Sequence, residues 1–449
     1  MLLALVLYGV VVLAIGAFSA RSASASPTAY IVGGRRFGGL ATSAALASTT
    51  IGGSTTLVLA ALVSRVGLPG LWLDLAGALG LSALALFLAA RVRETGALTI
   101  SEVIGRVYGP AVRRVAALLT VLAEVVWFAL LAQATEIVIT AATGWDADRV
   151  LVSTAALFIV YTALGGQRAV VGTDVFQLGL MAVALLGIAL PLAGRALLAS
   201  EVPRELLRFP VSAGFSWADV AAMLVLVGLP HTVGGDVWAK LLSARDAGVA
   251  RRAALFAAGA KLAFGLSTAS IALAGVSMGI ASGPALFPKT VLALTGPLLA
   301  PLLLVAMIAT MQSSSDSVLL SAAAATAHDL LPGGSPTVMR LLVVGYGALG
   351  LVVALALRDL LETFRLGYTL FASGLILPAL LGFTRFRIAP AGAAAAMLAG
   401  GAAALVERFL HPLGIDPVLA GTAVNAAVLA GALLLRSGRR SPPRPAVPA

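Results

Sequence analysis

The feature that most constrains this chain is a series of long stretches without a charged residue. They run from Met1 to Ala20, Phe37 to Ser64, Val175 to Gly194 and Leu262 to Pro288. A helix of about 20 apolar residues matches the hydrocarbon thickness of a bilayer. Within lipid the backbone must satisfy its own hydrogen bonds, and a helix does so within one segment. These stretches therefore predict an all-α membrane protein.

The composition supports this fold class. Hydrophobic residues make up 60% of the chain and charged residues 11%, whereas soluble domains carry about 25% charged residues. The apolar segments predict about thirteen transmembrane helices. They lie at residues 2–20, 39–64, 70–92, 113–143, 148–165, 173–195, 214–242, 252–280, 297–329, 337–357, 361–383, 388–407 and 416–435.

The net charge of +11 is spread between the apolar segments rather than gathered on one face. We therefore expect no nucleic-acid partner. The basic residues instead indicate which loops lie on the inner side of the membrane. With the N-terminus outside and the C-terminus inside, most arginines and Lys240 fall in inner loops. The absence of cysteine excludes disulfides and thiolate metal sites. Abundant Ala, Leu, Gly and Arg with few Lys suggest a prokaryotic multi-pass protein of the plasma (inner) membrane.

Both ends of the chain carry interpretable signals. The first segment could be a signal peptide, but no basic residue precedes its apolar core, and Arg21, Arg35 and Arg36 follow it. We interpret it as a retained helix. Residues 438–449 are basic and rich in proline, which predicts a disordered cytoplasmic tail. Residues 1–437 are predicted to form a single transmembrane domain.

Two apolar segments contain residues that weaken a helix. Segment 39–64 has a polar, glycine-containing middle, and segment 214–242 contains Gly228, Pro230, Gly234 and Gly235. Broken helices at matching positions of two halves indicate a transporter binding site. Because the two segments lie five apart, they predict inverted repeats over about 39–195 and 214–383. For Gly52 and Gly53, close helix packing remains an equal alternative.

The segment 297–329 is unusually rich in oxygen-bearing side chains. Thr310, Ser313, Ser314 and Ser317 are spaced so that they share one helix face, and Asp316 lies close to it. Hard cations prefer oxygen ligands, and a buried carboxylate in lipid requires a partner. The cluster therefore predicts a sodium site. Hydroxyls could instead bond back to carbonyls of their own helix, but this does not explain Asp316.

Asp174, in GGQRAVVGTDVFQ, has two interpretations of equal weight. It could stabilise a helix N-terminus with Thr173 as the cap, or it could have a functional role.

The stretches YTALGGQRAVVGTDVFQ and MQSSSDSVLLSAAAATAHDLL resemble the two most recognisable stretches of the sodium:solute symporter family. The similarity extends from Tyr30 to about Arg387. The resemblance implies a LeuT-like fold with a five-plus-five inverted repeat, and sodium-coupled symport of a small polar solute into the cell. Na⁺ would be the coupling ion, and we expect no organic cofactor.

The resemblance also implies ion ligands. A sodium site would use the carbonyls of Ser48, Ile51 and Thr310 and the hydroxyls of Ser313 and Ser314. A possible second cation site would use Asp174, Ser313, Asp316 and Ser317, and its carboxylates could equally serve a proton.

The solute is expected beside the two breaks. The candidate contacts are Thr49, Thr50, Gly52, Ser54, Thr55, Trp127, His231, Thr232, Trp238 and Lys261. Lys261 resembles a lysine near the sugar in sugar-transporting relatives, and an ion pair with Glu124 is an equally good interpretation. Sugar carriers have a Glu-Gln pair where Ser54 and Thr55 stand, and proline carriers have an aspartate where Thr50 stands. Neither substrate is supported, whereas an organic anion, amino acid or vitamin-like acid fits half-helix N-termini.

Other classes are weighed against a symporter. An enzyme is not expected, because His231, His328 and His411 are far apart and show no metal or triad spacing. A proton-coupled carrier of the same fold, or a channel or solute sensor that retains it, remains the alternative. The expected partners are a small solute and the lipid bilayer, with no obligate protein partner.

Overall fold

The computed structural model describes residues 1–331 and 333–437, apart from the side chains at positions 22, 54, 370, 436 and 437. The predicted tail at 438–449 lies outside the described residues. The described part is helical, and its β-pairing is limited to two isolated bridges. Eleven of its helices, or up to twelve with one bent pair counted as a span, are long and apolar enough to cross a membrane.

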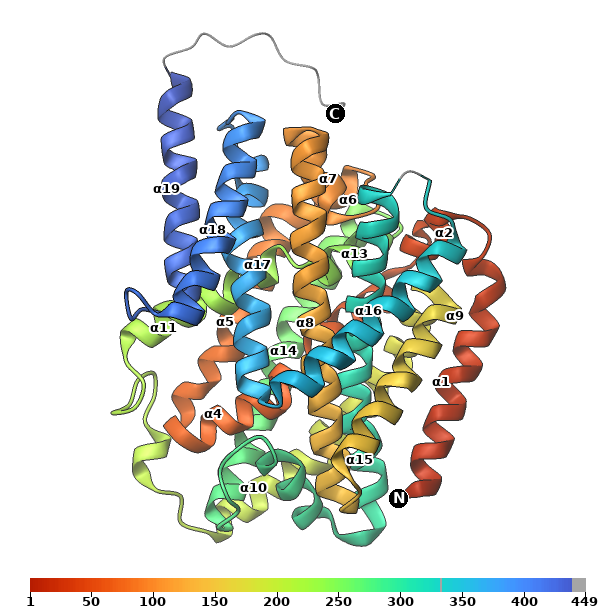
Figure 1. The fold of residues 1–449 in the computed structure, drawn as a ribbon. Helices are drawn as coiled ribbons and strands as arrows, with labels where there is room; N and C mark the ends of the chain where they lie inside the picture. Colours follow the sequence, from red (N-terminus) through yellow and green to blue (C-terminus); the bar gives the residue numbers. More distant parts are fainter. Residues whose placement is uncertain (332, 438–449) are drawn as a thin grey trace.

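The long helices form an upright bundle (Figure 1). They are α1 (Leu2–Ala23), α8 (Pro110–Thr143), α9 (Ala147–Met181), α14 (Ala247–Ser277), α15 (Leu286–Ala324), α16 (Pro336–Leu357), α17 (Leu360–Gly382), α18 (Pro390–Leu410) and α19 (Pro417–Ser437). In the middle of the bundle α15 packs against α8 and α9, and α17 covers another side of α8. The start of α1 and the end of α19 lie at opposite ends of the bundle.

Shorter helices complete the spans or connect them. They are α2 (Pro27–Val32), α3 (Gly39–Thr50), α4 (Leu59–Val66), α5 (Trp72–Ala83), α6 (Ala89–Glu94), α7 (Ile100–Tyr108), α10 (Leu190–Ala199), α11 (Trp217–Met223), α12 (Leu229–Thr232) and α13 (Gly235–Ser243). Turns of π-helix at Ser54–Val58, Leu84–Leu88, Ala182–Ala189, Leu224–Gly228 and Ala325–Leu330 join several of them.

The predicted segments 148–165 and 173–195 belong to one helical run, Ala147–Ala199, of 53 residues. A straight helix of that length would extend about 80 Å, far more than a bilayer requires. Gly166 interrupts it with φ 55° and ψ −163°, a conformation that favours glycine. A similar kink at Gly296, with φ 64°, lies where the sequence placed the start of segment 297–329, although α15 already begins at Leu286.

The structure contains both expected helix interruptions. Between α3 and α4 the chain leaves helical geometry at Ile51, with φ −102° and ψ 25°, and the two halves are bent by 53°. Between α12 and α13 the break falls at Val233, with φ −139° and ψ 38°. Both breaks face the interior of the protein, where the freed backbone groups are shielded from lipid.

The second broken segment packs closely on α5 through glycine. A Cβ atom built on Gly80 would lie 2.0 Å from the carbonyl oxygen of Gly228. We expect Gly80→Ala to force α5 and the π-turn apart and to lower the free energy of unfolding by about 1–3 kcal/mol. Gly259→Ala in α14 is the control, since nothing lies within 4 Å of its added Cβ. Equal thermal stability of the two purified variants would contradict this packing role.

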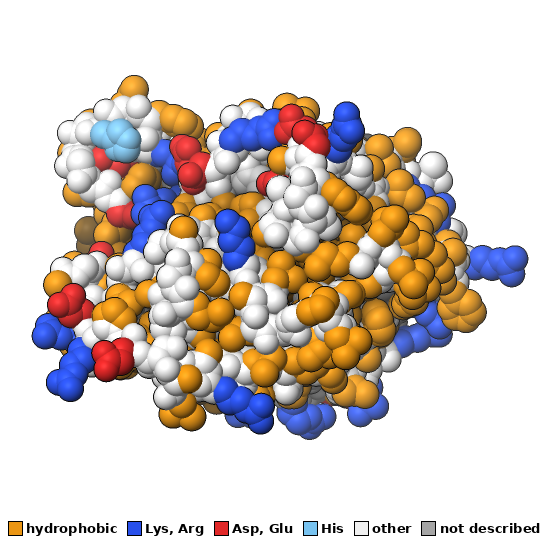
Figure 2. Space-filling model, turned by 90° about the horizontal axis from the view of Figure 1, so that it is seen from below, with side chains coloured by type: hydrophobic (Ala, Val, Ile, Leu, Met, Phe, Trp, Pro, Cys, Tyr) orange, Lys and Arg blue, Asp and Glu red, His pale blue; other side chains and the backbone are white. Residues whose placement is uncertain are grey.

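The surface agrees with a membrane environment. Large apolar side chains are exposed along the helices, with Phe18, Leu198 and Leu298 at 85%, 91% and 88%. Lys and Arg side chains are scattered singly or in small groups over the end shown in Figure 2, and they form no continuous basic patch on that face. The dispersal expected from the sequence is therefore visible there.

Candidate functional site

A contact between the break in α3 and the middle of α15 brings together several predicted sodium ligands. The Ser313 hydroxyl oxygen lies 3.0 Å from the carbonyl oxygen of Ser48 and 3.3 Å from that of Thr310. All three residues are fully buried. The Ser48 carbonyl is available because the helix stops two residues later, and only the Ile51 amide, at 3.3 Å, approaches it from its own segment.

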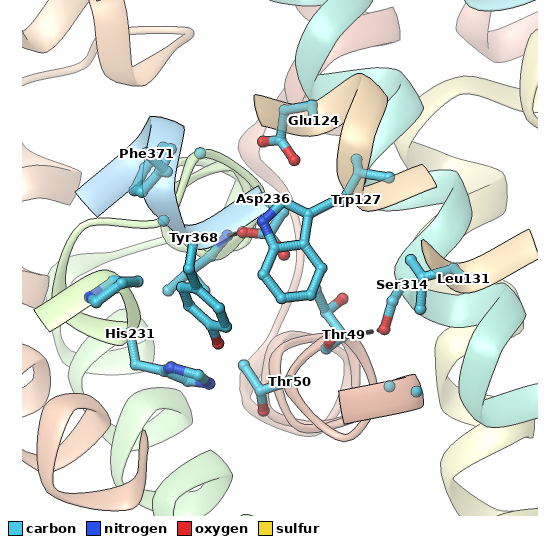
Figure 3. A pocket seen from close by; sticks show the side chains of 17 residues that line it. Thr49, Thr50, Glu124, Trp127, Leu131, His231, Asp236, Ser314, Tyr368 and Phe371 are labelled. Atoms are coloured by element: carbon cyan, nitrogen blue, oxygen red, sulfur yellow. Dashed lines mark hydrogen bonds between the residues drawn. The ribbon is translucent and has the colours of Figure 1, made fainter. Parts of the chain in front are cut away.

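The Ser314 hydroxyl takes a neighbouring position. It donates to the carbonyl oxygen of Thr49 at 2.8 Å and faces the central cavity (Figure 3). A Cβ atom on Gly52 would lie 2.5 Å from the Ser314 hydroxyl oxygen, so glycine permits this close approach of the break to α15. The structure thus gathers Ser48, Thr310 and Ser313, with Ser314 next to them, and of Ile51 it brings the amide to the Ser48 carbonyl.

The alternative role, in which a hydroxyl bonds to a carbonyl of its own helix, applies to Ser317 and to the neighbouring Ser315. Ser315 donates to the carbonyl oxygen of Met311 at 2.9 Å, and Ser317 donates to that of Ser313 at 2.9 Å. Ser317 also lies 3.2 Å from the Thr49 hydroxyl oxygen. Ser313 and Ser314 differ because their hydroxyls donate to backbone carbonyls of the opened helix, those of Ser48 and Thr49.

The possible second cation site contains an amino group of the protein itself. The Lys240 ammonium lies 2.8 Å from Asp174 Oδ2, and both side chains are at most 1% exposed. This corrects two expectations. Asp174 lies inside α9 rather than at a helix N-terminus, because the interruption falls earlier, at Gly166. Lys240 belongs to α13 and is buried rather than placed in an inner loop.

Asp316 completes this buried group. Its Oδ1 atom lies 3.4 Å from the Ser317 hydroxyl, and Asp174 and Lys240 both act on it electrostatically. Asp174 Oδ1 and Asp316 Oδ2 have no hydrogen-bond partner among the described residues. The group therefore holds two carboxyl groups and one ammonium.

Lys261 forms a second buried pair, with Asp74 and not with Glu124 as one interpretation of the sequence had it. Its Nζ atom lies 2.9 Å from Asp74 Oδ1, 2.9 Å from the carbonyl oxygen of Thr50 and 2.8 Å from the Thr55 hydroxyl. Thr50 is the last residue of α3, and a cation is favoured at a helix C-terminus. Lys261 and Thr55 thus both donate to the carbonyl at the C-terminus of α3.

The central cavity lies between the two breaks and is lined by α8, α15 and α17 as well (Figure 3). Its empty volume is about 660 Å³, a figure that includes the open space at its mouth. Five solute candidates line it, namely Thr49, Thr50, Gly52, Trp127 and His231.

Four other solute candidates are not among the lining residues. Thr55 and Lys261 belong to the Asp74 cluster. Thr232 donates to the carbonyl oxygen of Leu229 at 2.6 Å, and Trp238, fully buried, donates to that of Thr232 at 2.8 Å, which ties α13 to α12 across the break. The Ser54 side chain lies outside the described residues.

Sequence reasoning missed three prominent cavity residues, Asp236, Tyr368 and Phe371, and offered Glu124 only as an alternative to its ion pair with Lys261. Asp236 could have been found, since it directly follows the glycine pair at the second break. Tyr368 and Phe371 lie in an unbroken apolar segment, and no local feature marked them.

Comparison with known proteins decides the family. The model of the sodium:solute symporter family matches residues 30–400. The chain belongs to the sodium:solute symporter family. It is 29% identical over 162 residues to the human sodium/iodide cotransporter, a match that covers 36% of this chain and 25% of that protein.

Solved structures share the fold at low sequence identity. A Na⁺-coupled sialic acid symporter, captured substrate-bound and outward-open, aligns with a TM-score of 0.77 and 18% identity over 98% of both chains. Mhp1, a nucleobase-cation-symport-1 transporter, gives 0.61 and 16% over 92% of this chain and 95% of its own. MhsT in complex with L-phenylalanine gives 0.59 and 14% over 88% and 98%.

These similarities confirm the family resemblance and the LeuT-like fold predicted from the sequence. The symporter is a multi-pass membrane transporter rather than an enzyme, and its family supports Na⁺ as the coupling ion and a small molecule as the solute. The matched stretch of the human relative covers too little of that protein to carry over its substrate.

Proposed function

We propose that this symporter couples Na⁺ entry to the uptake of a small polar solute. Na⁺ would be held by the carbonyls of Ser48, Ile51 and Thr310 and the hydroxyls of Ser313 and Ser314. The observation that carries the proposal is the Ser313 hydroxyl within 3.0 Å and 3.3 Å of carbonyls on α3 and α15. A cation at this point would join the two helices, and so favour the conformation in which they are close.

The finer topology is also a proposal. Thirteen spans result if Gly166 divides the run Ala147–Ala199 into two and the bent pair α3–α4 counts as one. An odd number fits the termini at opposite ends of the bundle (Figure 1). The arginine distribution then supports an N-terminus outside and a C-terminus inside, and the composition supports a prokaryotic plasma membrane. The inverted repeats would cover about 39–195 and 214–383.

We further propose a single Na⁺ per transport cycle. In the expected second cation site, the partner of Asp174 is the Lys240 ammonium at 2.8 Å. The Lys240 ammonium would neutralise the Asp174 carboxylate in place of a second sodium ion. Asp316 is the second carboxyl group of this cluster. The alternative to a single Na⁺ alone is that Asp316 also binds and releases a proton during transport.

The solute would bind in the cavity between the two breaks. Thr49, Thr50 and His231 offer it polar contacts from both broken helices, and Trp127 offers an aromatic face. The sequence favoured an organic anion, an amino acid or a vitamin-like acid. A channel or a sensor of the same fold would lack saturable, Na⁺-dependent accumulation of the solute.

Sodium binding can be tested before the solute is known. In purified protein, Na⁺ should raise the melting temperature relative to equal K⁺. Ser313→Ala and Ser314→Ala should each raise the Na⁺ concentration needed for half of this shift about tenfold or more, because each removes a ligand from a buried cation.

Ser315→Ala is the matched control, since its hydroxyl bonds only within its own helix. An unchanged Na⁺ response in both Ser313→Ala and Ser314→Ala would reject the site.

A further inference from the structure

Two carboxyl groups face the central cavity, and among the described residues neither forms a salt bridge. Glu124, on α8, is only 3% exposed, and its Oε1 atom has no hydrogen-bond partner among the described residues. Asp236, in the first turn of α13, bonds to the Val237 amide at 2.7 Å. Figure 3 shows both carboxyl groups at the cavity. The residues that line it include neither lysine nor arginine.

The N-terminus of α13 is not open to an anionic group of the solute. Such a terminus attracts anions through its free amides and dipole. Here the protein supplies the anions, because Asp236 is in the first turn and Glu124 Oε1 lies 2.6 Å from the position of a Cβ atom on Gly235. A solute carboxylate at this point would meet two carboxyl groups of the protein instead of free amides.

Aromatic side chains line the cavity near Glu124 and Asp236. Trp127 and Tyr368 pack edge to face with ring centroids 4.8 Å apart, and Phe371 lines the same space. Aromatic faces together with carboxylates suit an organic ammonium. A metal ion would require more oxygen ligands, and the described residues contain no cluster of three acidic, histidine or cysteine side chains that could hold one.

We propose that the solute carries a protonated or quaternary amine, which binds between Glu124 and Asp236 and against Trp127 and Tyr368. An ammonium group there would offset the burial of both carboxylates. The proposal rests on the proposed function and narrows it. It retains amino acids, with the amine at this end of the cavity, and it disfavours simple organic anions.

The test compares matched probes on the wild-type protein in Na⁺ and in K⁺. The pairs are choline with 3,3-dimethyl-1-butanol, glycine betaine with 3,3-dimethylbutyrate, and γ-aminobutyrate with butyrate. We expect Na⁺-dependent thermal stabilisation and uptake into proteoliposomes for at least one ammonium probe, and none for its partner without nitrogen. A response to a partner compound as strong as to its ammonium probe, or none to any ammonium probe, would overturn the proposal.

The variant Glu124→Gln tests whether the Glu124 carboxylate binds the ammonium group of the probe. Glu124→Gln should weaken binding of the responding ammonium probe about tenfold or more, while the shift caused by Na⁺ alone stays as in the wild type. Glu136→Gln is the control on the same helix, half-buried and away from the cavity. Equal probe affinity in both variants would refute the amine site. Loss of the Na⁺ response in the wild type would instead refute the proposed function.

Discussion

Replacing Lys261 by methionine is expected to lower the free energy of unfolding by about 3–5 kcal/mol, because it leaves Asp74 as an unpaired buried carboxylate. Both side chains are 1% exposed, and Asp74 Oδ2 already lacks a hydrogen-bond partner among the described residues. The same change removes the ammonium that binds the Thr50 carbonyl at the end of α3. We therefore expect Na⁺-dependent stabilisation to be weakened as well.

Denaturation of the purified variants in detergent measures this effect. Lys289→Met makes the same substitution at an exposed lysine and should be close to neutral. The double variant Asp74→Asn, Lys261→Met removes both charges, and should recover much of the lost stability. If the double variant is as unstable as Lys261→Met alone, Lys261 acts through packing rather than through its charge.

The buried ion pairs Lys261–Asp74 and Lys240–Asp174 show what could not be predicted from the sequence. Glycine, proline and hydroxyl residues act on their own backbone, so the breaks near Ile51 and Val233 could be located from local sequence. An ion pair depends on how two distant helices are rotated against each other. Local sequence therefore offers Glu124 as one possible partner of Lys261, whose partner in the structure is Asp74, and it does not reveal the burial of Lys240.

The cavity shows the same limit. Thr49, Thr50 and His231 were expected there because they flank the breaks, and they line it. Thr55 and Trp238 lie slightly farther from the breaks in the same two segments, and they are turned to other contacts. Tyr368 comes from a continuous helix, and only the packing of α17 on α8 brings it beside Trp127.

The proposed role of Lys240 predicts a change in ion number. Lys240→Met leaves Asp174 and Asp316 without their ammonium, so in K⁺ we expect a loss of about 3–5 kcal/mol in the free energy of unfolding. Na⁺ should restore part of this loss by binding to the oxygen atoms that the missing ammonium leaves without a cation. The variant should then bind two Na⁺ ions. A plot of its stabilisation against Na⁺ concentration should be steeper than the one-site curve expected for the wild type.

The control variants separate charge replacement from general damage. Asp174→Asn combined with Lys240→Met removes one negative charge together with the ammonium, so its Na⁺ curve should return to one site. Lys289→Met should follow the wild type throughout. A one-site curve for Lys240→Met with the wild-type Na⁺ affinity would mean that no ion replaces the ammonium, and that the pair with Asp174 holds α13 against α9 and nothing more. A steep curve in the wild-type protein itself would show that two ions bind despite Lys240.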